Sequence, residues 1–139
     1  RGGEVAFSVT AQHGMQEGLE DDIEASNKKA VQFFKEGAKV EAVQTLHAAF
    51  RKLHHADATS TLCSATVLNN LGFMLRSLQD PAGAAAMHRK ALAVREKLLP
   101  PVHPQIAISL HNLASALLAA RQASEAVPLF ARVVTLHCE

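Results

Sequence analysis

Apolar residues recur along this chain with the spacing of a helix rather than of a strand. From residue 68 to residue 78, leucines return at intervals of three and four positions, which places them on one face of a helix. Asp80-Pro81 ends that helix and starts the next, with Asp80 as the cap and Pro81 at the first helical position. Pro100 and Pro101 end the second helix, because proline cannot donate a backbone N–H.

The same signals predict a helix pair on each side of this one. We expect helices over about 20–35 and 40–54, separated by Gly37, and over about 104–120 and from 124 almost to the chain end. Thr59 or Ser60 is expected to cap the helix that follows the polar stretch 56–60, and Ser124 to cap the last one. The fold class predicted is therefore all-α.

An internal repeat organises these helices. Segments 65–92 and 107–134 match at positions that are 42 residues apart. The matching pairs are Leu68 and Leu110, Asn70 and Asn112, Leu71 and Leu113, Leu75 and Leu117, and Ala84 and Ala126. A further step back from Ala84 reaches Ala42, in a weaker first copy.

Small residues recur where the two helices of a pair should cross. The first helices carry Ala30, Gly72 and Ala114, and the second helices carry Ala42, Ala84 and Ala126. A small residue on each helix lets the two axes approach to about 8 Å. One pair cannot bury its apolar face alone, so the expected domain, residues 20–139, stacks three helix-turn-helix units at about 23–55, 60–98 and 104–137. Residues 1–19 are expected to be a flexible or extended leader, in which segment 5–10 has strand-like composition.

Composition excludes several classes of function. The 139 residues are 48% apolar and 19% charged with a formal net charge of +1, so the chain lacks the basic footprint of a nucleic-acid-binding protein. No apolar run approaches the ~20 residues of a membrane helix. The chain has two cysteines, Cys63 and Cys138, which is too few for a disulfide scaffold. We interpret them as free thiols of a reducing compartment, which predicts a cytoplasmic location.

Motifs for catalysis and for metal or cofactor binding are not found in the sequence. There is no phosphate-binding glycine loop, no Gly-x-Ser-x-Gly and no His-Glu-x-x-His, so we expect no enzymatic activity and no cofactor. His47, His54 and His55 lie near one helix end, but zinc sites need short-spaced ligand pairs, so no metal site is expected. His88 falls at a core position, where we expect a hydrogen-bonded, partly buried side chain. The acidic run that begins at Glu17 is interpreted as a solvated helix start.

The repeated residues resemble the tetratricopeptide repeat. Leu71-Gly72, Leu75, Ala84 and Ala91 fit its pattern with His88 as the exception, and Leu113-Ala114, Leu117, Ala126 and Phe130 fit it with Val133 as the exception. The usual period is about 34 residues, and the excess here is about two helical turns of ~3.6 residues each. This long form is typical of kinesin light chains and their relatives, which segments 91–97, 103–104 and 109–114 also resemble. The resemblance covers about residues 23–137 and implies a right-handed α-α superhelix of three units.

The resemblance also implies which residues line a groove. First helices of tetratricopeptide units line the concave side, which would place there Asn27, Lys28, Val31, Asn69, Asn70, Phe73, Arg76, His111, Asn112, Ser115 and Leu118. Asparagine can bond both polar groups of an extended peptide backbone. Asn70 and Asn112 are therefore predicted to hold a peptide, and the alternative is that they only bridge neighbouring first helices. The carboxylate-clamp version of the family is not expected, because of its five positions only Asn70 matches.

Two functions remain open at this point. The first is a protein-interaction module that binds a peptide segment of a partner protein in the concave groove, with no role for nucleic acid or membrane. The alternative is a structural or oligomerising segment of a larger protein, such as a regulatory appendage of an enzyme, that packs on further repeats or on a second copy through its last unit. We expect no polar capping helix after residues 134–136, and this expectation motivates the alternative. The resemblance adds an association with the cytoskeleton.

Overall fold

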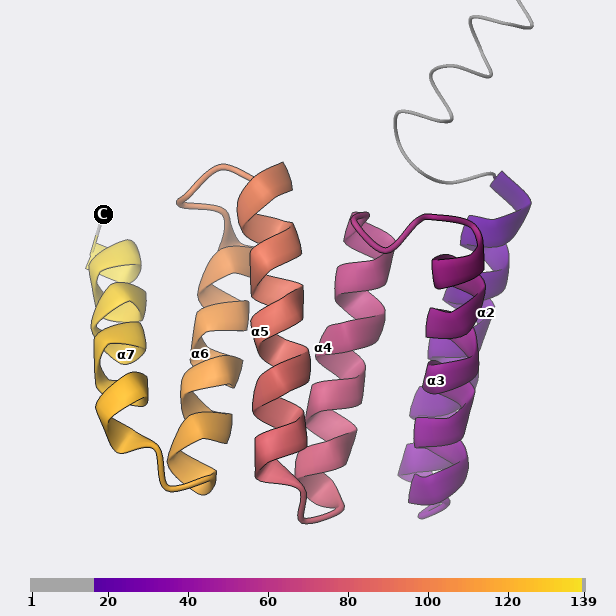
Figure 1. Cartoon of the computed structure of the whole chain (residues 1–139), viewed down its shortest axis with the longest axis horizontal. Helices are drawn as coiled ribbons and strands as arrows, with labels where there is room; N and C mark the ends of the chain where they lie inside the picture. The colour runs from indigo at the N-terminus through magenta and orange to yellow at the C-terminus, as the bar shows by residue number, and fades with distance from the viewer. Residues whose placement is uncertain (1–16, 139) are drawn as a thin grey trace, which may run out of the picture. The chain divides into compact units, whose positions relative to one another are not determined.

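The computed structural model describes residues 17–138, so most of the expected leader, including segment 5–10, lies outside the described residues. The described part consists of six α-helices and contains no strand, which confirms the all-α prediction. Their bounds are α2 Glu17–Lys35, α3 Lys39–His55, α4 Leu62–Ser77, α5 Pro81–Leu98, α6 Pro104–Ala119 and α7 Ala123–Cys138. Figure 1 shows α2 and α3 as one antiparallel hairpin, and α5, α6 and α7 as an alternating series.

The chain divides into two compact units, Arg1–Val67 and Leu68–Glu139, with the boundary inside α4. The first unit holds the α2–α3 hairpin, and the second holds most of α4 together with α5, α6 and α7. Each unit is described by itself below. The expected division into three helix pairs stays a prediction.

The turn that joins the two helices of a pair has the same geometry three times, at intervals of 42 residues. Gly37, Gln79 and Arg121 follow α2, α4 and α6 with positive φ angles of 85°, 67° and 64°. The residue after each of them donates its N–H to a carbonyl five positions back: Ala38 to Phe33 at 2.8 Å, Asp80 to Leu75 at 2.9 Å, and Gln122 to Leu117 at 2.8 Å. This is the Schellman ending of a helix. The backbone therefore repeats with the period found in the sequence, although only the first turn has the glycine that this conformation favours.

Replacing Gln79 by glycine is expected to raise the free energy of unfolding by about 1 kcal/mol, because a side chain in the left-handed region is strained. The matched control is Gln44→Gly, at an exposed position inside α3. There the free energy of unfolding should instead fall by about 1 kcal/mol, because glycine has a low helix propensity. Urea unfolding of both variants measures the two changes. A loss of stability in Gln79→Gly would contradict the strain argument.

The helix starts follow the predicted signals at two places and differ at two others. Asp80 Oδ1 accepts the N–H of Gly83 at 3.0 Å, and His103 Nδ1 accepts the N–H of Gln105 at 3.1 Å ahead of Pro104. The predicted caps of α4 were Thr59 or Ser60, but Thr61 Oγ1 accepts the N–H of Ser64, so the cap lies one or two residues later. Ser124 was also predicted as a cap and instead lies inside α7, since the carbonyl of Gln122 accepts the first N–H groups of that helix.

The predicted small residues at the helix crossings are buried. Ala30 of α2 and Ala42 of α3 are fully buried in the first unit, as are Ala84, Ala114 and Ala126 in the second. In the second unit they join one apolar cluster, whose larger members include Leu92, Ile106, Leu110, Leu113 and Leu117. Small residues at the crossings thus let the leucines of neighbouring helices fill the remaining space.

Candidate functional site

The predicted groove residues of the second unit lie on α4 and α6. Asn112 Nδ2 donates a hydrogen bond of 2.9 Å to Asn69 Oδ1, so the two first helices are joined by an amide pair. Asn112 therefore does bridge the first helices, as the alternative interpretation held, although its partner is Asn69 rather than Asn70. A carboxamide has two donor hydrogens and an acceptor oxygen, so Asn112 can form further hydrogen bonds besides the one to Asn69.

Other predicted groove residues lie on the same two helices as this amide pair. Phe73 of α4 and Leu118 of α6 are 63% and 47% exposed, which is high for residues of their size. Arg76 is exposed at the C-terminal end of α4, and Ser115 is half-buried on α6. His111 is exposed, and its ring meets the Phe130 ring edge-on with centroids 5.8 Å apart.

A hollow of about 470 Å³ opens beside the amide pair, on the α6–α7 side. Its lining comes from α6 and α7 and consists of Pro104, Ala107, Ile108, His111, Asn112 and Val133. None of these side chains carries a formal charge apart from the titratable His111, so the hollow favours an uncharged ligand surface. We call it the α6–α7 hollow.

The remaining predicted groove residues belong to the first unit. Asn27, Lys28 and Val31 lie on α2, where Lys28 Nζ approaches Glu24 Oε1 at 3.7 Å and Val31 is 37% exposed. Both partners of that ion pair are largely exposed, so it contributes little stability. The assignment of these three residues to the groove stays a prediction.

A buried polar cluster lies behind the groove in the second unit. Arg95 of α5 is 5% exposed and donates from Nη1 to Ser109 Oγ of α6 at 2.6 Å, while its Nε has no partner. His88 is 3% exposed, so it is more deeply buried than predicted, and its Nδ1 has no hydrogen-bond partner among the described residues. Burial, helped by the nearby charges of Arg95 and Arg76, lowers the pKa of His88 to about 4. His88 is therefore neutral at pH 7.

Two ion pairs connect the second helices α5 and α7. Arg89 Nη2 lies 3.0 Å from Glu125 Oε2, and Arg132 Nη2 lies 2.9 Å from Glu96 Oε2. In the first pair the positive charge is on α5, and in the second pair, seven residues further along each helix, it is on α7. A shift of one helix along the other would separate these opposite charges, so the two pairs favour one register of α7 on α5. Glu125 and Arg132, the two residues of α7 that are Lys, Arg, Asp or Glu, are thus both in ion pairs.

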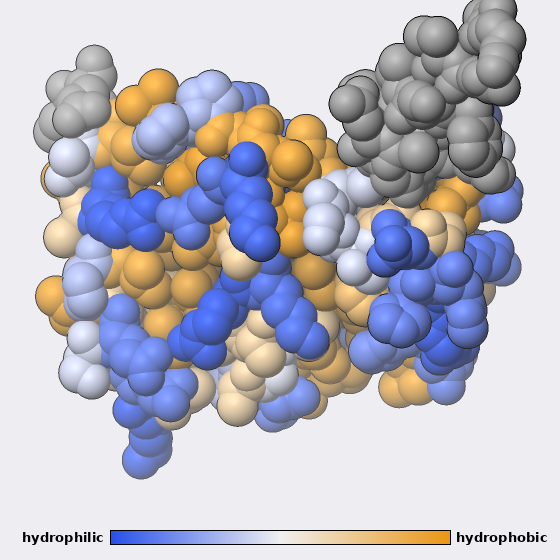
Figure 2. Space-filling view, turned by 45° about the horizontal axis from the view of Figure 1, so that its top comes forward, coloured by the Kyte–Doolittle hydropathy of each residue, from blue (hydrophilic) through white to orange (hydrophobic). Residues whose placement is uncertain are grey.

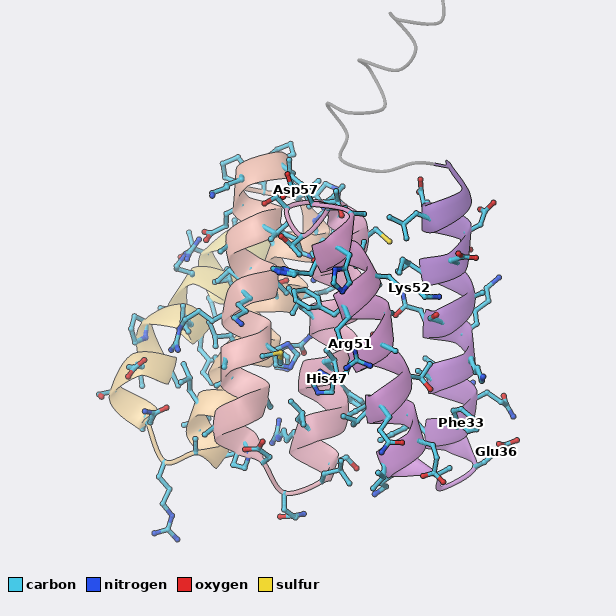
Figure 3. The ribbon with its side chains drawn as sticks, turned by 45° about the vertical axis from the view of Figure 1, so that its right-hand side comes forward. Phe33, Glu36, His47, Arg51, Lys52 and Asp57 are labelled. Atoms are coloured by element: carbon cyan, nitrogen blue, oxygen red, sulfur yellow. The ribbon has the colours of Figure 1, made fainter. Side chains whose placement is uncertain are left out.

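Three histidines, His47, His54 and His55, lie on α3. Figure 3 shows His47 and Arg51 on α3, and His54 and His55 follow near its end with ring centroids 6.3 Å apart. Over the described residues, no three His, Cys, Asp or Glu side chains are grouped as metal ligands. Burial, with the nearby charges of Glu20 and Glu24, raises the pKa of the Cys63 thiol, so this cysteine is not an activated nucleophile. Within residues 17–138, no helix combines the length and the apolar character needed to cross a bilayer.

Comparison with known proteins identifies the repeat. The family model described as "Tetratricopeptide repeat" matches residues 63–139, which is more than half of the chain. The chain belongs to the tetratricopeptide repeat family. No curated protein sequence matches it.

Solved structures of other proteins share its fold. One is BtubC (BKLC) from P. vanneervenii, with 25% identity over 97% of this chain and 54% of that chain, at a TM-score of 0.77. Two are from Podosopora anserina, a protein named as a kinesin light chain with nearly identical TPR-like repeats and a point variant of it. They are 22% identical over 90% and 89% of this chain and 58% of theirs, at a TM-score of 0.80. The chain thus spans just over half the length of the structures that it matches, and its repeats are of the kinesin-light-chain-like type in fold.

Family membership settles the function at a coarse level. Tetratricopeptide repeats generally bind protein partners or serve as scaffolds, and the fold is typically a non-catalytic interaction module. The predicted class of function, protein interaction, is confirmed to that extent.

The buried pair Arg95 and Ser109 was not predicted from the sequence. Both lie on apolar stripes, Arg95 three residues after Leu92 and Ser109 three residues after Ile106. A polar residue at the core position of two consecutive helices is a signal that could have paired them.

Proposed function

We propose that the chain binds an extended peptide segment of a partner protein along the first helices of its units. In the second unit, Asn70 and Asn112 would hold the peptide backbone, and Phe73 and Leu118 would contact its apolar side chains. The positive charge of Arg76, on α4 of the same unit, would favour an acidic peptide.

One observation carries this proposal, the amide pair between Asn69 and Asn112. It supports a continuous polar row on α4 and α6, because the two helices that carry the predicted asparagines are in contact at those residues. The exposed rings and methyl groups of Phe73 and Leu118 lie on the same two helices. A polar row flanked by exposed apolar side chains suits an extended chain, whose backbone needs hydrogen bonds and whose side chains need apolar contacts.

Titration calorimetry with a panel of peptides tests the proposal. We expect the best peptide to bind with a Kd of about 1 μM, equivalent to roughly −8 kcal/mol. The double substitution Asn70→Ala and Asn112→Ala should weaken it about 100-fold, since each lost amide contact costs about 1.4 kcal/mol. Unchanged affinity in that variant would show that the groove is assigned wrongly.

Asn69→Ala is the matched control, because it removes the bond to Asn112 while leaving both proposed peptide-holding amides in place. Its melting temperature should fall with that of Asn112→Ala, and its peptide affinity should stay within about twofold of the unsubstituted protein. If Asn69→Ala and Asn112→Ala weaken the peptide equally, the asparagines only join the helices and do not hold the peptide.

A further inference from the structure

One charged side chain of the second unit lies in its interior. On the face of this unit that Figure 2 shows, hydrophilic side chains lie over apolar ones, whereas Arg95 of α5 is only 5% exposed. It donates from Nη1 to Ser109 Oγ of α6 at 2.6 Å, and its Nε has no partner among the described residues. Glu96, the acidic residue next to it in the sequence, pairs with Arg132 instead. Arg95 is therefore a buried cation whose hydrogen bond goes to a neutral hydroxyl.

The burial of this charge is unfavourable for folding. Water solvates a guanidinium better than one hydroxyl does, and burial accordingly lowers the pKa of Arg95. The preceding repeat fills the same positions without a charge, because the residues 42 positions earlier are Leu53 and Val67, both fully buried. The pair of Arg95 and Ser109 is therefore not required for packing at these positions.

Directionality distinguishes the polar pair from the apolar one. Apolar contacts are non-directional, so they let a helix rotate by small amounts about its axis. A hydrogen bond requires its donor and acceptor at a defined distance and angle. Besides the bond from Arg95 of α5 to Ser109, the side chains of α6 make one such contact to a neighbouring helix within residues 17–138, from Asn112 to Asn69 of α4. Two directional contacts, to two different helices, therefore fix the rotation of α6.

Of these two contacts, the one at Ser109 is out of reach of water. Ser109 is fully buried, whereas the bond between Asn112 and Asn69 is part-buried, so water competes there for the amide groups. Ser109 precedes Asn112 by three residues, which places the two side chains on neighbouring turns of one side of α6. A rotation of α6 that moves Ser109 away from Arg95 therefore moves the Asn112 amide as well.

We propose that Arg95 is a positioning residue for peptide binding: through Ser109 it holds α6 in the rotation that presents the Asn112 amide to an extended peptide. This inference rests on the proposed peptide site, and it adds to that site a residue that does not touch the peptide. It also gives a reason for the tolerance expected of Asn69→Ala, because the buried bond still holds α6 when the amide pair is lost.

A double variant, Arg95→Leu with Ser109→Val, tests the proposal by giving both positions the residues of the preceding repeat. Its midpoint of urea unfolding should equal or exceed that of the unsubstituted protein, since the buried charge is removed. Solvent exchange of the Asn112 side-chain NH₂ should be about tenfold faster in it. NMR measures this exchange, and the signal is assigned by its absence in Asn112→Ala. Titration calorimetry should show the best peptide bound about tenfold more weakly.

Two further variants are the controls. Ser109→Thr has the shape of Ser109→Val but keeps a hydroxyl that accepts from Arg95, so it should retain both the exchange rate and the peptide affinity. Lys97→Leu removes the same charge from the last turn of α5 at an exposed position. Its affinity should stay within about twofold of the unsubstituted protein, because solvent screens an exposed charge.

Unchanged exchange and unchanged affinity in the double variant would overturn the proposal, because apolar packing would then position α6 equally well. A loss of affinity accompanied by a lower urea midpoint would also overturn it, since Arg95 would then have a structural role only. If no peptide binds the unsubstituted protein, the peptide site itself is refuted. The exchange rate of the Asn112 amide needs no peptide, so it still shows by itself whether Arg95 holds that amide in place.

Discussion

Replacing Gly72 by alanine is expected to lower the free energy of unfolding by about 2 kcal/mol, although alanine is the better helix former. A Cβ at position 72 would lie 2.6 Å from Nε2 of His88, which is closer than real Cβ atoms approach other atoms. His88 is buried and its ring is rigid, so either α4 or α5 must shift. Urea unfolding of the variant measures the loss.

A double-mutant cycle identifies the cause. The other two copies of the repeat carry alanine at the position of Gly72, with Leu46 or Phe130 in place of His88. Gly72→Ala combined with His88→Leu should therefore recover at least 1 kcal/mol relative to the sum of the single changes. Gly18→Ala is the control, because nothing lies within 4 Å of a Cβ at that position, and it should be neutral or slightly stabilising. Strict additivity in the cycle would show that the two side chains do not clash.

The stability of the protein is expected to fall by about 3 kcal/mol through His88 alone as the pH is lowered from 7 to 4. Burial, then Arg95 and Arg76, lowers the pKa of His88 from 6.5 to about 4. Above pH 6.5 the imidazole is neutral in both states and folding is not penalised. Between pH 6.5 and pH 4 the unfolded chain takes up the proton while the folded chain does not, so stability falls. Below about pH 4 both states are protonated and this contribution is constant.

Denaturant unfolding at pH 7, 5.5 and 4 measures this effect by comparison with His88→Leu. The carboxyl groups contribute to the pH dependence of both proteins. The difference between the two slopes of unfolding free energy against pH therefore gives the contribution of His88. Equal slopes in His88→Leu and the unsubstituted protein would contradict the assignment.

Local sequence signals located the helices well. Gly37, Asp80 and Pro104 act within one turn of the backbone, and they ended or began helices where expected. They failed at the start of α4, where Thr59, Ser60 and Thr61 in a row all offered a cap and Thr61 is the one used, and at the start of α7, where the helix begins before Ser124. Which of them caps depends on where the helix packs, and that is not a local property.

The sequence by itself determined the helical fold and the period of 42, because both follow from spacing along the chain, and the resemblance of its repeated residues indicated the family that the family model confirms. Only the tertiary structure decided that Asn112 meets Asn69, that Arg95 meets Ser109 and that His88 lies over Gly72. Only it showed Val127 and Val134 uncovered, where Ala85 and Leu92 are covered. The physical reason is that periodicity tells which face of a helix is apolar, whereas the residue opposite is set by how two helices pack. A valine has the same place in the pattern whether a neighbouring helix covers it or water does.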